Sequence, residues 1–166
     1  MNPESVRELF LYDQWAFERV WDCITQLKDE QFITPVDYSR GSIRNQVVHM
    51  MSTSQRWVLR MQMAPMPERL AFEDFPTETI TKAKWDEIQR QTMDYVTSLN
   101  QAQLDETVRW ELPDRGITAE NRRWELLLHM ANHGTDHRAQ ILAILNQHYG
   151  IQTVEQDMIL YLTETP

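Results

Sequence analysis

The amino-acid sequence predicts an all-α protein, a four-helix bundle with long connectors and a short C-terminal helix. Apolar residues recur at three- and four-residue steps in four long segments, as they do on one face of a helix. Only four glycines occur in 166 residues, and long segments of the chain avoid both glycine and proline. The connectors span about a dozen to twenty residues, longer than the tight turns of an up-down bundle. A chain of this length accommodates one domain, residues 1–166.

The first two helices have recognisable start signals. The spacing predicts a helix over residues 3–28, with Asn2 as its cap and Pro3 at its first position. A polar loop is expected over 29–41. A second helix then begins near Ser42 and carries an apolar stripe that ends at about residue 61.

The next two elements are a third helix and a short extended piece. Three prolines mark residues 64–76 as a connector. The third helix is expected from Thr81 to about Asn100, with Ile80 and Trp85 as a hydrophobic staple. Apolar and polar residues then alternate over 108–112 before a turn signal, which predicts an extended piece or hairpin too small to change the fold class.

The last two predicted helices follow this piece. Asn121 is expected to cap the fourth long helix, which ends before Gly150. Thr153 and Gln156 then have the spacing of a capping box, which predicts a short fifth helix to about Leu162.

Charge and composition exclude several classes of function. A net charge of -9 without any basic run argues against nucleic-acid binding. No apolar run approaches the ~20 residues that span a bilayer, and the first residues lack the pattern of a secretory signal. Cys23 is the only cysteine and falls on an apolar helix face, so a buried inert thiol is expected. These features suggest a cytoplasmic protein.

The fourth long helix carries a row of histidines. His129, His133 and His137 are each four residues apart, so neighbours lie one turn apart on nearly the same side of the helix. The outer pair is separated by about 12 Å along the axis at roughly 1.5 Å per residue, so one adjacent pair, not all three, would hold one ion. A histidine row without a metal is the competing interpretation.

A third ligand would have to come from another element. His49 lies beside the apolar stripe of the second helix, where it could reach a cleft or point to solvent. Neutral imidazole suits Zn and Ni, and a catalytic site commonly uses three protein ligands with an open position. The zincin signature H-E-x-x-H shares the four-residue spacing, but Gly134 replaces its Glu in 133–137, so protease chemistry is not supported. Asp136 could orient a ligand or lie in solvent.

The chain resembles the DinB-like family, also called DinB/YfiT-like, of small bacterial metal-binding proteins. The resemblance covers nearly the whole length. It is carried by Y-D-Q-W-A at 12–16, G-S-I-R-N-Q-V-V-H-M at 41–50, L-L-L-H-M-A-N-H-G-T-D-H-R-A-Q at 126–140 and D-M-I-L-Y at 157–161. The third stretch is similar to the family's N-H-x-x-x-H-R-x-Q segment, which Arg138 and Gln140 complete.

This resemblance implies a four-helix bundle that holds a divalent metal through His49, His133 and His137. His129 then becomes a flanking residue. Zn and Ni are the ions expected first, with Mn and Fe as alternatives. The family is often homodimeric, and its members include metal-dependent S-transferases that use low-molecular-weight thiols and proteins assigned as metal hydrolases.

Three functions are therefore compared. The first is a metal-dependent thiol S-transferase that acts on a small-molecule substrate. The second is a metal-dependent hydrolase, in which bound water is the nucleophile. The third is a non-catalytic metal-binding, stress-associated protein whose ion braces the bundle. Catalytic side chains beyond the metal ligands are not identified by the sequence, and a nucleic-acid binder ranks last on charge.

Overall fold

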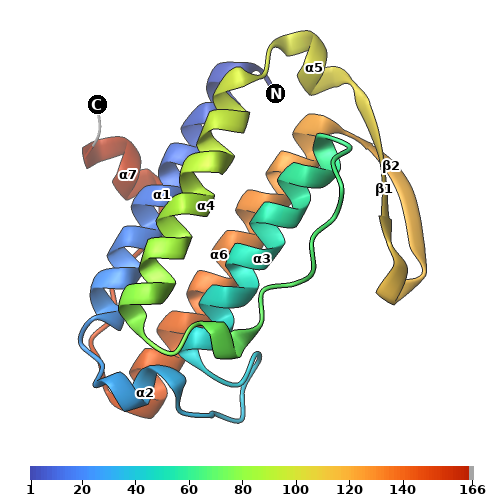
Figure 1. Ribbon diagram of the computed structural model, residues 1–166. Coiled ribbons are helices and arrows are strands. Elements are labelled where there is room, and N and C mark those ends of the chain that lie inside the picture. The colour runs from blue at the N-terminus through green and yellow to red at the C-terminus, as the bar shows by residue number, and fades with distance from the viewer. Residues whose placement is uncertain (165–166) are drawn as a thin grey trace.

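The computed structural model describes residues 1–164 and is mostly helical (Figure 1). Four long helices run side by side: α1 (Pro3–Ile24), α3 (Ile43–Met61), α4 (Glu78–Ser98) and α6 (Arg123–Tyr149). α1 and α3 each pack against both α4 and α6. The shorter elements are α2 (Asp29–Ile33), η1 (Phe72–Asp74), α5 (Gln101–Asp105), β1 (Thr107–Leu112), η2 (Pro113–Arg115), β2 (Ile117–Arg122) and α7 (Met158–Glu164).

The helices begin and end where short polar residues and glycine satisfy their backbone groups. Asn2 Oδ1 accepts a hydrogen bond from the Ser5 N–H at 2.8 Å, and Ser42 Oγ accepts one from the Asn45 N–H at 3.0 Å. α6 ends at Gly150, which adopts a left-handed φ of 65° that favours glycine. The predicted caps of the first and second long helices and the predicted end of the fourth are therefore confirmed.

The interior consists of two apolar clusters. One gathers side chains such as Phe17 and Trp85, whose rings stack with centroids 3.4 Å apart. The other lies nearer α5 and the hairpin and includes Trp57 and Leu127. Along α6, His133 and His137 fall between residues of the second and first clusters, so the histidines lie at the level where the two meet. No helix within residues 1–164 combines the length and the apolar character that crossing a membrane requires.

A buried ion pair joins α1 to α6 near this level. Arg138 Nη1 donates to Asp13 Oδ1, and the two residues are 0% and 8% exposed. Arg138 Nε also donates to Gln156 Oε1 at 2.7 Å. Gly134 makes the approach of the two helices possible, because a Cβ at this position would lie only 2.6 Å from Asp13 Oδ1. The guanidinium of Arg138 thus connects α6 to α1 and to the segment that precedes α7.

The all-α prediction is wrong in one respect, because a two-stranded antiparallel sheet is present. β1 and β2 form a hairpin in which Val108 pairs with Asn121 and Leu112 with Ile117. The turn includes Gly116 at a φ of 63°, a left-handed conformation that favours glycine. The alternating pattern at 108–112 therefore does form a hairpin, and Asn121 lies in β2 instead of capping the fourth helix, which begins at Arg123.

Three other predicted boundaries are also corrected. The first helix ends at Ile24, and part of the expected loop forms α2. The third begins at Glu78 because Thr77 Oγ1 caps it, accepting from the Ile80 N–H at 3.3 Å. Ile80 is 47% exposed and Trp85 only 2%, which argues against the expected staple. α7 begins at Met158, not near residue 153, because the segment before it is extended and bonds to Arg138 through Gln156.

Candidate metal centre

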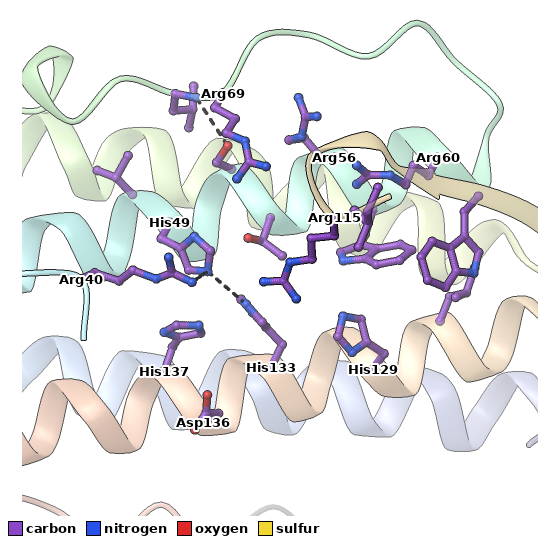
Figure 2. Close-up of a pocket in the computed structure, with 18 of the residues that line it drawn as sticks. Arg40, His49, Arg56, Arg60, Arg69, Arg115, His129, His133, Asp136 and His137 are labelled. Carbon is purple, nitrogen blue, oxygen red and sulfur yellow. Dashed lines mark hydrogen bonds between the residues drawn. The ribbon is translucent and has the colours of Figure 1, made fainter. Parts of the chain in front are cut away.

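Three imidazoles from two helices converge on one point. His49 comes from α3, and His133 and His137 come from successive turns of α6. One ring nitrogen from each histidine lies within 4.8 Å of the corresponding nitrogens of the other two (Figure 2). α3 packs directly against α6, and the four-residue spacing places the two α6 rings on one face. This histidine triad is therefore a group that could hold a metal ion.

His129 lies outside the triad. Its ring centroid is 6.1 Å from that of His133 and 5.1 Å from that of Trp57, against which it packs edge-on. The structure therefore brings His133 and His137, not His129 and His133, to His49. His129 instead forms part of the wall of the adjoining pocket.

A chain of hydrogen bonds fixes which nitrogen of His137 faces the triad. The Asp136 carboxylate can only accept, and it accepts from Gln140 Nε2 at 3.0 Å. Gln140 Oε1 is thereby free to accept from Gln46 Nε2 at 3.0 Å. Gln46 Oε1 in turn accepts from His137 Nδ1 at 2.8 Å. The proton of neutral His137 therefore lies on Nδ1, and its Nε2 presents a lone pair.

His49 presents a lone pair for a similar reason. Arg40 Nη2 lies 3.1 Å from His49 Nε2, and because a guanidinium only donates, this ring nitrogen is the acceptor. His49 Nε2 is also 3.2 Å from His133 Nε2. Two nitrogens bound to one tetrahedral ion at about 2.05 Å would be about 3.3 Å apart. The other separations between the ring nitrogens are at most 4.8 Å. Side-chain movements of only about 1 Å would bring all three nitrogens to a common ion, so the donor set and its spacing fit a divalent metal.

Burial keeps these imidazoles neutral. It lowers the pKa of His49 to about 3, with Arg40 and the other two histidines adding to the shift. Burial, followed by the neighbouring His137, lowers the pKa of His133 to about 4. The pKa of His137 is lowered by burial too, although Asp136 opposes the change. A neutral ring is the form that coordinates a metal, so the site does not depend on deprotonation at neutral pH.

These shifts predict that metal-free protein loses stability in acid. The unfolded chain takes up protons at histidine below a pH of about 6.5, while folded His49 and His133 resist protonation until about 3 and about 4. The unfolded state therefore binds more protons in this window. The free energy of unfolding consequently decreases as the pH is lowered. The melting temperature of chelator-treated protein, measured between these pH values, should drop more steeply than that of a His133→Gln variant. A variant with a substitution at His148, which is exposed and lies outside the triad, is the control for this comparison.

A pocket of about 780 Å³ opens beside the triad. All four residues His49, His129, His133 and His137 line it, together with Asp136. An apolar wall is formed by side chains of α3, α6, the connector after α3 and the hairpin, namely Val48, Trp57, Leu70, Phe72, Trp110, Leu112, Ile117 and Leu126. The lining also includes five arginines: Arg40, Arg56, Arg60, Arg69 and Arg115. The histidines thus lie in the wall of a cavity large enough for a small molecule.

Several lining and supporting residues were not predicted from the sequence. Gln46 precedes His49 by three residues, so helical spacing places both on the same side of α3. That relation was a usable signal for a residue that orients a metal ligand. No comparable signal existed for the arginines of the pocket, because they come from separate segments and meet only in the folded chain. Asp136, whose role was left open, is exposed and anchors the hydrogen-bond chain to His137.

The structure also explains why a glycine, and not the Glu of the zincin signature, lies between His133 and His137. Gly134 occupies the position of that Glu, and it faces Asp13 of α1. A carboxylate side chain there would displace the ion pair with Arg138 and could not serve as a base in the pocket. The sequence-based exclusion of zincin chemistry thus agrees with the packing.

Comparison with known proteins shows which family the chain is related to. The family model described as "DinB family" matches residues 1–165. Protein DinB of Bacillus subtilis (strain 168) is 25% identical over 164 residues, which cover 95% of each chain. The matched region contains all the long helices and all three histidines of the triad. The chain therefore belongs to the DinB family.

Proposed function

We propose that this protein binds a divalent metal ion through His49, His133 and His137 and acts as a metal-dependent thiol S-transferase on a small molecule. The observation that carries the proposal is the convergence of three neutral imidazoles in the wall of a pocket of about 780 Å³. Zn or Ni suits three imidazoles best, with Mn or Fe as alternatives. The four long helices would form the four-helix bundle that holds this site.

A bound ion would supply a Lewis acid that lowers the pKa of a coordinated thiol, so that the thiolate predominates at neutral pH. The protein supplies the rest. Gln46 holds His137 in the tautomer that presents Nε2 to the centre. Trp57 and Trp110, whose rings meet edge to face with centroids 5.3 Å apart, provide an apolar wall for the second substrate. The overall reaction joins the thiol sulfur to an electrophilic carbon, while the leaving group departs with its electron pair and the thiol proton passes to solvent.

Thiol transfer is favoured over hydrolysis because the carboxylates that line the pocket already accept hydrogen bonds from neighbouring groups. Metal-dependent hydrolases commonly place a general acid or base beside the metal-bound water. Asp136 and Glu125 are the two carboxylates among the described residues that line the pocket. Glu125 accepts from the Arg122 N–H at the start of α6, and Asp136 accepts from Gln140. A thiol that ionises on the metal needs no such base.

Conjugation of small thiols to monochlorobimane tests this function. In that reaction the sulfur bonds to the methylene carbon and chloride leaves. Purified protein should accelerate the reaction with at least one thiol, lose the activity on chelation and regain it when Zn or Ni is restored. If loaded and chelated protein are equally inactive across a panel of thiols, the transferase assignment is wrong. Chelator-sensitive hydrolysis of an ester in the same preparation would favour the hydrolase. A metal-dependent melting temperature without turnover would favour a structural ion.

Gln46→Ala is expected to weaken metal binding by about 10- to 100-fold, the usual effect of removing a group that orients a metal-bound histidine. The substitution removes the acceptor of the His137 Nδ1 proton. Competition with a chromophoric chelator would measure the affinity. Gln55→Ala on the same helix is a matched control, because Gln55 lines a different groove, on the α4 side. Equal affinities of the two variants would contradict the role of Gln46.

A further inference from the structure

The pocket beside the triad is strongly basic, although the chain as a whole is acidic. Its lining contains five arginines and two carboxylates, a formal charge of +3 with neutral histidines. The full chain carries -9. Five of the 16 basic residues therefore gather around one cavity. A concentration of like charge of this kind costs electrostatic energy in the empty protein and is compensated when an anion binds.

The arginines reach the pocket from separate parts of the chain. Arg56 and Arg60 lie one turn apart on α3, and Arg69 belongs to the connector that follows it. Arg40 precedes α3, and Arg115 projects from the turn of the hairpin, pointing toward the histidine side of the pocket in Figure 2. Convergence from four segments is not the pattern of a solvated helix face, and it gives the pocket donors on several sides.

Most of these guanidinium groups have no carboxylate partner. Arg69 pairs with Asp114. Over residues 1–164, no ion pair is formed by the other four arginines of the pocket. Arg56 donates to the carbonyl oxygen of Pro67, and Arg60 donates to that of Glu111 at 3.3 Å, so both are positioned by neutral groups. Burial first, and then the nearby Arg56 and Arg69, lower the pKa of Arg60.

We propose that the substrate of this site is a small anionic molecule whose carboxylate or phosphate oxygens are held by Arg56, Arg60 and Arg115 while its reacting group lies at the histidine triad. Guanidinium groups bind both oxyanions with paired hydrogen bonds. The cavity of about 780 Å³ has the size of a small-molecule site. Trp57 lies under the Arg60 guanidinium, 5.0 Å from it, so the charged side of the pocket adjoins its apolar wall. Only the placement of the reacting group at the histidine triad rests on the proposed function. The binding of the oxyanion by the arginines does not depend on the metal.

Calorimetry at low ionic strength tests the anion site, with succinate compared with its neutral diamide, succinamide, and glycerol 3-phosphate compared with glycerol. Each anion should bind at least about tenfold more tightly than its neutral analogue, as expected for charge-assisted hydrogen bonds. The stronger of the two anions identifies carboxylate or phosphate as the preferred group. Arg115→Gln should weaken anion binding by about tenfold, and Arg56→Gln combined with it should weaken binding further. Arg109→Gln is the matched control, because Arg109 belongs to the same hairpin but lies outside the pocket, beside Glu111.

The titrations are repeated on chelated and on Zn-loaded protein, which separates this inference from the proposed function. Anion binding by chelated protein that is weakened in Arg115→Gln and unchanged in Arg109→Gln supports the anion site whether or not the protein binds Zn. If Zn binds but neutral analogues bind as tightly as anions, the anion site is rejected while the metal centre stands. Equal affinities of the Arg115→Gln and Arg109→Gln variants would also overturn it.

Discussion

His137→Ala is expected to abolish stoichiometric metal binding. The triad has three nitrogens, and removing one leaves a single imidazole from each of α3 and α6, too few to hold a divalent ion in competition with water. The affinity should fall by more than the about 10- to 100-fold that loss of an orienting group costs. Elemental analysis of protein purified without added metal would show an ion in the parent chain and little in the variant.

Two histidine variants serve as controls for this result. His129→Ala should retain the ion, because its ring packs on Trp57 and lies 6.1 Å from His133. His148→Ala should also retain it, since His148 is exposed near the end of α6. Circular dichroism would establish that all variants are folded. If His129→Ala loses the metal and His137→Ala keeps it, the assignment of the pair on α6 is wrong.

The sequence predicted the long helices well because their signals are local. Helical periodicity and caps depend on residues a few positions apart, and Ser42 and Gly150 mark real boundaries. The clustering of histidines was also accessible from the sequence, since the spacing on one helix limits which imidazoles can meet. The choice between the two histidine pairs depended on family resemblance, because both pairs have the same spacing.

Other features depend on contacts between distant segments, and local patterns do not encode these. The capping-box spacing of Thr153 and Gln156 predicted a helix start, but Gln156 is used by Arg138, 18 residues away in sequence. From the sequence, Gly134 was informative only because it replaces the Glu of the zincin signature. In the structure, the absence of a side chain at Gly134 leaves room for Asp13 of α1. The arginine cluster likewise exists only when the hairpin folds back over α3.

The ion pair between Asp13 and Arg138 leads to the largest expected change in stability. Arg138→Met leaves the Asp13 carboxylate buried without its partner, which should lower the free energy of unfolding by about 3–5 kcal/mol. Asp13→Leu should cost a similar amount, because it leaves a fully buried guanidinium with neutral acceptors alone, namely the Gln156 and Thr135 side-chain oxygens and the backbone carbonyl of residue 13. Urea denaturation with a fixed slope would give both values.

The double variant Asp13→Leu/Arg138→Met decides whether the pair stabilises the fold or only avoids an unpaired charge. Buried ion pairs replaced together by apolar residues of similar volume are often tolerated, since the desolvation penalty disappears with both charges. The double variant should therefore be more stable than either single variant, with a coupling energy of about 2 kcal/mol or more. Additive losses would show instead that the two side chains act separately. Because Asp13 and Arg138 belong neither to the histidine triad nor to the lining of the pocket, metal content should be retained in the double variant, as expected for an ion pair of the scaffold.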